Sequence, residues 1–172
     1  MSIELLEEDE PFGNISLNSF RASALFERTF DEGMSLVEEC ARYLDGRGRN
    51  DSRALSRKTA LVYAGESMRV TTRLMQAASW LLIQRAVQEG DMSAEDAASE
   101  RYRLGAREIC MGKREEGIEA LPGKLIELLD RSESLYRRIA RLDDVFFQPG
   151  KMASGVQSQF ARLNAAFAQD GE

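Results

Sequence analysis

The side chains that enzymes use most often for acid–base and nucleophilic chemistry are scarce in this sequence. Histidine is absent from all 172 residues. Its absence excludes Ser-His-Asp and Cys-His catalysis, zinc sites of the HExxH type and the Glu-x-x-His pattern of di-iron helical bundles. Carboxylates, cysteines and a phosphate-binding loop are the next candidates for catalytic chemistry.

Three pairs of adjacent carboxylates are the first of these candidates: Glu38-Glu39, Glu115-Glu116 and Asp143-Asp144. Acid–base catalysis requires a carboxyl group whose pKa is shifted by a cleft or by a neighbouring charge. Adjacent residues on a helix point in different directions, so the two members of a pair do not converge on one substrate. We interpret all three pairs as solvated surface residues.

The cysteines and the glycine-rich segment offer no chemistry either. Cys40 and Cys110 form no CxxC pair, and without an export signal a structural disulfide is not expected, so we predict that both pack as small apolar residues. The segment "DGRGRNDSR", residues 45–53, lacks the GK[ST] ending of a P-loop and a preceding strand. The sequence therefore predicts a non-enzymatic protein with no cofactor and no metal site.

Arginine is the side chain that remains for a functional role. Arg69 and Arg73 are four residues apart and share a helix face. Glu66 offers Arg69 a local ion pair; the alternative is that the two arginines form a docking face for acidic side chains of a partner. Residues 45–53 leave similar alternatives open, a solvated loop or a surface for an acidic partner. The candidate partner-binding residues are Arg47, Arg49, Arg69, Arg73, Tyr102, Arg103 and Arg107.

Nucleic-acid binding is disfavoured by the charge balance. The chain has 23 Lys and Arg against 29 Asp and Glu, a net charge of −6, which opposes unspecific binding to polyanions. The long helix that carries Arg69 and Arg73 is also too apolar on two sides to enter a DNA groove. Trp80, the only tryptophan, lies between apolar neighbours and is either a core residue or an anchor in a dimer interface.

Helices must position these residues. Hydrophobic residues make up 43% and charged residues 30% of the chain, as in a soluble domain with its own core. The pattern divides the chain into an acidic flexible arm (1–16), a helical bundle domain (17–148) and a mobile C-terminal tail (149–172). The tail carries a thin apolar stripe at helical spacing: Val156, Phe160, Leu163 and Phe167.

Three long helices account for the bundle domain. The first begins at a cap among residues 16–19 and runs to about residue 44, the second covers 56–89, and the third covers 122–146. A loop over residues 45–53 joins the first two. A short helix capped by Ser93 and an irregular stretch lead to the third. Strand patterns are absent.

Two apolar seams run along the second helix. One is Leu61, Ala64, Met68, Thr71, Met75, Ala78 and Leu82, and the other is Tyr63, Ser67, Val70, Leu74, Ala77 and Leu81. A helix with two adjacent seams is buried on a wide arc and has neighbours on both sides, in the centre of a bundle or in a dimer interface. The predicted fold is therefore an all-α, antiparallel three-helix bundle with long helices and flexible termini, which forms a homodimer.

The sequence also predicts the compartment. No apolar run approaches the roughly 20 residues that a membrane-spanning helix needs. The acidic start "MSIELLEEDE" lacks the basic-then-apolar order of a secretory signal. We therefore expect a cytoplasmic protein.

Four long strings in the sequence resemble one bacterial family. They are "FDEGMSLVEECARYLDGRGR" (30–49), "YAGESMRVTTRLMQAASWLLIQRAV" (63–87), "ASERYRLGAREIC" (98–110) and "LPGKLIELLDRSESLYRRIARLD" (121–143). They are similar to helices and blocks of the RcdA-like proteins, the regulators of CtrA degradation. The resemblance extends over residues 20–144 and leaves out the arm and the tail.

The resemblance implies a helical-bundle dimer that acts as an adaptor and has no active site. Members of the family help the ClpXP protease recognise regulatory substrates, including the transcription factor CtrA. They work beside CpdR, which resembles a response regulator, and PopA, an adaptor that binds cyclic di-GMP. By resemblance, the partners are ClpX or ClpXP, a CpdR-like protein, a PopA-like adaptor and protein substrates, and these would concentrate the protein at a cell pole. The alternative function is a helical scaffold or a DNA-associated regulatory dimer without a role in proteolysis.

Overall fold

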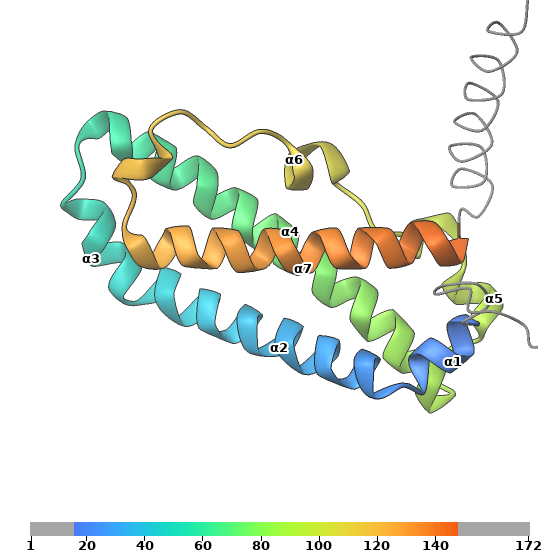
Figure 1. Ribbon diagram of the computed structural model, residues 1–172. Coiled ribbons are helices and arrows are strands. Elements are labelled where there is room, and N and C mark those ends of the chain that lie inside the picture. Colours follow the sequence, from blue (N-terminus) through green and yellow to red (C-terminus); the bar gives the residue numbers. More distant parts are fainter. Residues whose placement is uncertain (1–15, 148–172) are drawn as a thin grey trace, which may run out of the picture.

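The computed structural model describes residues 16–147, and every regular element in that range is a helix (Figure 1). The predicted all-α fold is confirmed. The long helices are α2 (Ala24–Asp45), α4 (Arg57–Glu89) and α7 (Gly123–Phe147). The short ones are α1 (Leu17–Arg21), α3 (Arg47–Arg53), α5 (Ala94–Ala97), η1 (Glu100–Tyr102), α6 (Arg107–Met111) and η2 (Ile118–Ala120). Apart from Ser16, the arm predicted for residues 1–16 and the tail predicted for 149–172 lie outside the described residues and stay predictions.

Serine side chains set the starts of four helices. The hydroxyl of Ser16 accepts a hydrogen bond from the Ser19 amide at 3.1 Å and caps α1. A second cap corrects the predicted first helix, which is two helices: Ser23 accepts from the Phe26 amide and donates to the Phe20 carbonyl at 2.6 Å. These two bonds satisfy backbone groups at the junction and let the chain turn between α1 and α2. Ser56 and Ser93 cap α4 and α5 in the same way.

The stretch 45–53, predicted as a loop, contains the helix α3. Two tyrosines hold it in place: the Tyr63 hydroxyl donates to the Gly48 carbonyl at 3.0 Å, and the Tyr43 hydroxyl donates to Asp51 Oδ2 at 3.0 Å. Gly48 is buried, and a Cβ there would lie 2.8 Å from the Tyr43 carbonyl oxygen and 2.6 Å from the Tyr63 hydroxyl. The glycine that suggested a loop is therefore the residue that lets the helix pack closely.

Replacing Gly48 with alanine is expected to lower the free energy of unfolding by about 1–3 kcal/mol, because the added methyl group meets backbone that cannot move away cheaply. Urea unfolding followed by circular dichroism measures the effect. Gly123→Ala is the matched control, since a Cβ at Gly123 meets nothing within 4 Å. Equal stability of the two variants would show that α3 is not anchored at Gly48.

The three long helices are not uniformly antiparallel, which corrects the predicted arrangement. Contacts between α4 and α7 advance in the same direction, from Arg73 with Glu133 to Trp80 with Asp143, so these helices run parallel. α2 runs opposite to α7. The reason is the connection over residues 90–122, which returns along α4 before α7 begins (Figure 1). The sequence suggested only a modest link, and the backtracking of this segment has no local signal.

The core lies between the inner faces of α2, α4 and α7. The helical spacing of the third long helix predicts one apolar seam: Leu121, Leu125, Leu128, Ser132, Leu135, Ile139, Leu142 and Phe146. All of these are buried except Leu142 and Phe146, which are half-buried. Both cysteines are buried as predicted. Burial, helped by the neighbouring carboxylate of Glu39, raises the pKa of the Cys40 thiol to about 11. None of the helices in the described part of the chain combines the length and apolar character needed to cross a membrane.

Candidate protein-interaction surface

The outer face of α4 is an apolar stripe that no part of the described chain covers. Of the two predicted seams, the one through Val70 and Leu74 is packed in the core, whereas the other faces outward. Its large members are strongly exposed: Leu61 71%, Met68 72%, Met75 67% and Leu82 50%. They recur every seven residues and follow the helix for about 32 Å. The sequence predicted neighbours on both sides of this helix, and the described residues supply a neighbour on its inner side only.

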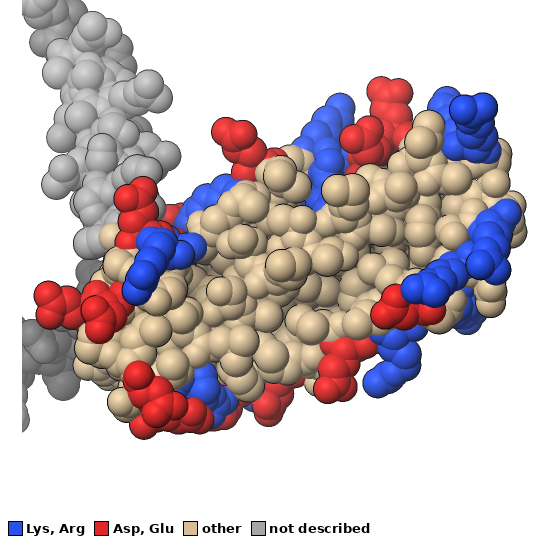
Figure 2. Space-filling view, turned by 180° about the vertical axis from the view of Figure 1, so that it is seen from behind, with Lys and Arg blue, Asp and Glu red and all other residues tan. Residues whose placement is uncertain are grey.

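This outer face also lacks charge. Every exposed residue of α4 from Leu61 to Leu82 is apolar, small or neutral: Leu61, Ala64, Gly65, Met68, Thr71, Met75, Ser79 and Leu82. α4 passes behind α7 in Figure 1, and the view from behind in Figure 2 shows a broad surface with few charged side chains, bordered by acidic and basic groups. A continuous apolar surface of this kind with a polar border is typical of a protein-binding site. Methionines at its centre add a side chain that adapts to different partners.

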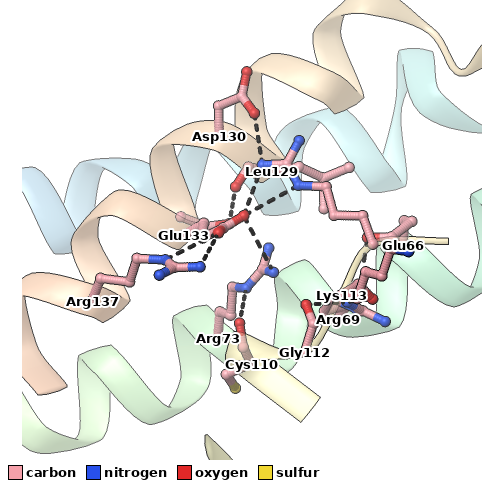
Figure 3. Close-up of polar contacts among 12 residues, drawn as sticks. Glu66, Arg69, Arg73, Cys110, Gly112, Lys113, Leu129, Asp130, Glu133 and Arg137 are labelled. Atoms are coloured by element: carbon pink, nitrogen blue, oxygen red, sulfur yellow. Dashed lines mark hydrogen bonds and ion pairs between the residues drawn. The ribbon is translucent and has the colours of Figure 1, made fainter. Parts of the chain in front are cut away.

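The arginines Arg69 and Arg73 do not belong to this surface, which corrects the prediction that they form a docking face (Figure 3). Arg73 is fully buried, and its Nε donates to the Cys110 carbonyl at 2.7 Å. Arg69 is largely buried and donates to the carbonyls of Gly112 and Lys113 at 3.0 and 2.8 Å. Both side chains therefore fasten the returning segment to α4. The predicted pair between Arg69 and Glu66 is present at 3.7 Å.

Glu133 on α7 completes this internal charge cluster (Figure 3). Its carboxylate receives hydrogen bonds from Arg114 and Arg137 and lies 3.7 Å from the buried Arg73 guanidinium. Burial alone would raise the pKa of Glu133, but the hydrogen bonds from Arg114 and Arg137 outweigh it and leave the pKa lowered. Four separate segments thus share one set of charges: α4, the end of α6, the loop after it and α7.

A second internal cluster is centred on Asp143, which we predicted as a solvated residue. It is instead 1% exposed, and its carboxylate receives hydrogen bonds from Trp80 Nε1 at 3.0 Å, from Arg103 at 2.8 Å and from Arg107 at 3.0 Å. Trp80 is therefore the core residue of the two alternatives. Arg103 and Arg107, predicted as partner contacts, are held on α7 by this carboxylate, and Arg107 also pairs with Asp144.

Three of the predicted partner-binding residues remain available at the surface. Arg47 and Arg49 are strongly exposed on α3. Among the described residues, Arg47 pairs only with Asp51 at 3.9 Å, and Arg49 pairs only with Asp45 at 3.1 Å. Tyr102 is half-buried, with the Arg101 guanidinium 4.5 Å from its ring centre.

Sequence reasoning missed Asp143, Glu133 and Arg114, because no local pattern tells a buried ionic partner from a solvated one. It found the outer face of α4 from the seam through Leu61, Met68 and Met75.

These features define a class: an all-helical protein in which the charges around Glu133 and Asp143 form structural clusters and the outward α4 face is suited to protein contacts. Within residues 16–147, no group of His, Cys, Asp or Glu is arranged to hold a metal ion.

Comparisons place the chain more closely. The family described as "Protein of unknown function (DUF1465)" matches residues 17–167. The crystal structure of RcdA from Caulobacter crescentus CB15 is 54% identical, covers 76% of this chain and 97% of that one, and superposes with a TM-score of 0.62. No curated protein matches the sequence. The chain therefore belongs to the RcdA-like family.

Proposed function

We propose that this protein is a non-enzymatic adaptor that delivers protein substrates, such as a CtrA-type cell-cycle regulator, to the ClpXP protease. The identity of 54% with RcdA over nearly all of that chain carries the proposal. An adaptor of this kind works by tethering, which raises the concentration of the substrate at the protease without any reaction of its own. The rigid helical body with an uncharged contact face on α4 supports such a role.

The partners proposed by this likeness are ClpX or ClpXP, a CpdR-like response regulator, a PopA-like adaptor and the substrates themselves. We place the protein in the cytoplasm, concentrated at a cell pole by these partners. Among the contact residues suggested by the sequence, the exposed Arg47 and Arg49 remain in the proposed set, together with Tyr102. Arg69, Arg73 and Arg103 leave it because they are occupied inside the protein.

We further propose that two copies pair through the outer face of α4 and complete a helical bundle across the dimer. The stripe from Leu61 to Leu82 supports this contact, since it is apolar, free of charge and long enough for several helical turns. A DNA-associated dimer has less support, because Arg69, Arg73 and Arg103 are bound to internal acceptors and do not form a phosphate-binding row.

A reconstituted degradation assay tests the adaptor proposal. Purified ClpXP, the CpdR-like and PopA-like proteins and a CtrA-type substrate are combined with and without this protein, and substrate loss is followed on gels. We expect degradation to be several-fold faster with the protein, through the gain in effective concentration. Reactions without ATP are the control for unspecific loss. An unchanged rate for every candidate substrate contradicts the adaptor role and leaves the scaffold as the alternative.

A further inference from the structure

One end of the molecule is strongly basic, in contrast to the chain as a whole. The end of α2, the helix α3 and the first turn of α4 meet there (Figure 1). Between residues 42 and 58, six exposed cations face two carboxylates, in a chain whose net charge is −6. Lys and Arg side chains gather at this end in Figure 2, on the right. We call it the basic end: Arg42, Arg47, Arg49, Arg53, Arg57 and Lys58.

Four of the six cations of the basic end are not used by the fold, whereas Arg47 and Arg49 pair with Asp51 and Asp45. Arg42, Arg53, Arg57 and Lys58 have no ion pair among the described residues, in contrast to Arg103, Arg107, Arg114 and Arg131, which are paired with carboxylates. The helix α3 at this end is held by Tyr43 and Tyr63, which donate to Asp51 and to the Gly48 carbonyl. The structure therefore presents a group of exposed cationic side chains on a fixed backbone, four of which have no ion pair among the described residues.

The position of these charges is unfavourable for the free protein. Arg57 and Lys58 occupy the first turn of the 33-residue helix α4, and that turn has no acidic residue. The positive end of the helix dipole favours acidic side chains there and disfavours cations by a few tenths of a kcal/mol or more each. An anionic partner would relieve this repulsion. The same placement means that glutamate at either position does not disturb the helix.

From these observations we propose that the basic end binds an acidic peptide segment of a partner protein. Five of its six cations are arginines, whose planar guanidinium groups pair with carboxylates through two hydrogen bonds. A DNA duplex fits less well, because it would extend past the basic end. Removing these six cations and two carboxylates from the totals of 23 and 29 leaves the rest of the chain with a net charge of −10, which repels a polyanion.

The acidic run Glu7 to Glu10 of the same chain lies too close to α1 to reach this surface. The arm joins α1, which contacts α4 near Gln84, and the basic end at Arg57 is about 40 Å away along that helix. Glu7 to Glu10 lie at most nine residues before Ser16, and even a fully extended chain reaches only about 30 Å over that length. This acidic run is therefore not the occupant of the basic end.

This inference deepens the proposed adaptor function by naming the chemistry of one partner, and it rests on that function only for its biological use. The experiment measures binding directly with the full-length protein. The probe is a fluorescein-labelled peptide of alternating Glu and Gly, roughly 12 residues long so that it spans the basic end. A peptide of the same length with Gln in place of every Glu is the uncharged control. Fluorescence anisotropy gives the affinities at low and at high salt.

The test variant is Arg57→Glu with Lys58→Glu, and the matched control is Arg28→Glu with Arg141→Glu, which alters the net charge equally at exposed positions elsewhere. We expect the test variant to bind the Glu peptide about tenfold more weakly or worse and to melt at the same or a higher temperature, since its new carboxylates suit the helix start. The control should keep wild-type affinity.

Three outcomes would overturn the proposal: equal weakening in both variants, tighter binding of a short DNA duplex than of the Glu peptide at physiological salt, or loss of dimers in the test variant, which would assign the basic end to a second copy. The degradation assay separates this inference from the proposed function. Wild-type protein that accelerates degradation but ignores the Glu peptide refutes only the acidic-peptide site.

Discussion

Replacing Met68 and Met75 together with glutamate is expected to turn the protein into a monomer that is still folded. Both side chains are about two-thirds exposed or more in the single chain, at 72% and 67%, so the helices lose almost no internal contact. In a two-fold interface each substitution occurs twice, and four carboxylates would lose their hydration without gaining a partner. We expect the dimer dissociation constant to rise by about a hundredfold or more, as is typical when charge enters the centre of an interface.

Sedimentation velocity over a range of protein concentrations measures this change, and circular dichroism confirms that the helices are intact. Leu25→Glu is the control: Leu25 is also exposed, at 53%, but it lies on the side of α2 that faces α7, as does Glu32, which pairs with Arg138. This control should remain dimeric. If wild type is monomeric at high concentration, or if the Met68 and Met75 variant still forms dimers, pairing through α4 is refuted.

Asp143→Ala is expected to be the most destabilising single substitution in the charged clusters, with a loss of about 3–4 kcal/mol in the free energy of unfolding. The buried carboxylate holds Trp80 on α4 and Arg103 in the returning segment. Its removal leaves the indole N–H without an acceptor and the Arg103 guanidinium without its carboxylate, whereas Arg107 keeps Asp144. Some of the loss is recovered because Arg107 is 34% exposed and can be hydrated.

Chemical denaturation with urea measures this loss, and the neighbouring residue provides the control. Asp144 is also a carboxylate on α7, but it is 34% exposed and pairs only with Arg107. Asp144→Asn should therefore cost less than about 1 kcal/mol, the usual range for an exposed ion pair. Comparable losses at the two positions would show that Asp143 is not the structural centre of this cluster.

The same carboxylate gives the cluster a defined pH dependence. Burial alone would raise the pKa of Asp143, but the hydrogen bonds from Arg103 and Trp80 outweigh it and hold the pKa below its ordinary value of 3.8. Because the folded pKa is the lower one, the charged group stabilises the fold at all pH values above the unfolded pKa, and this contribution is lost as the pH falls through the folded pKa. The stability difference between wild type and Asp143→Asn should be constant near neutral pH and shrink below about pH 4.

The two variants test contacts made by opposite faces of α4, because Asp143 on α7 binds Trp80 on the inner face of that helix. Trp80 and Arg73 on the inner side of α4 bind the returning segment and α7 through carboxylates and carbonyls. Met68 and Met75 on the outer side have no neighbour in the described chain. α4 therefore has one side that is used by the fold and one side that is left exposed.

Several features of the fold followed from the residues alone because their causes are local. Serine caps at Ser16 and Ser93, and a glycine at Gly90 in the left-handed conformation at φ +83°, mark helix ends wherever they occur. The apolar spacing of α7 predicted its buried side correctly. Likewise, the seam through Leu61, Met68 and Met75 indicated a second apolar face of α4. Such signals depend on helical geometry and not on what packs against it.

The sequence by itself determined the helical class, the family likeness and the unsatisfied apolar seam of α4. Only the tertiary structure decided which arginines are free for a partner: Arg73 and Arg103 are internal, whereas Arg49 and Arg57 are exposed. The parallel course of α4 and α7 was decided at the same level. The physical reason is that burial and charge pairing depend on segments distant in the chain, 63 residues apart for Trp80 and Asp143, and no local pattern records such a partner.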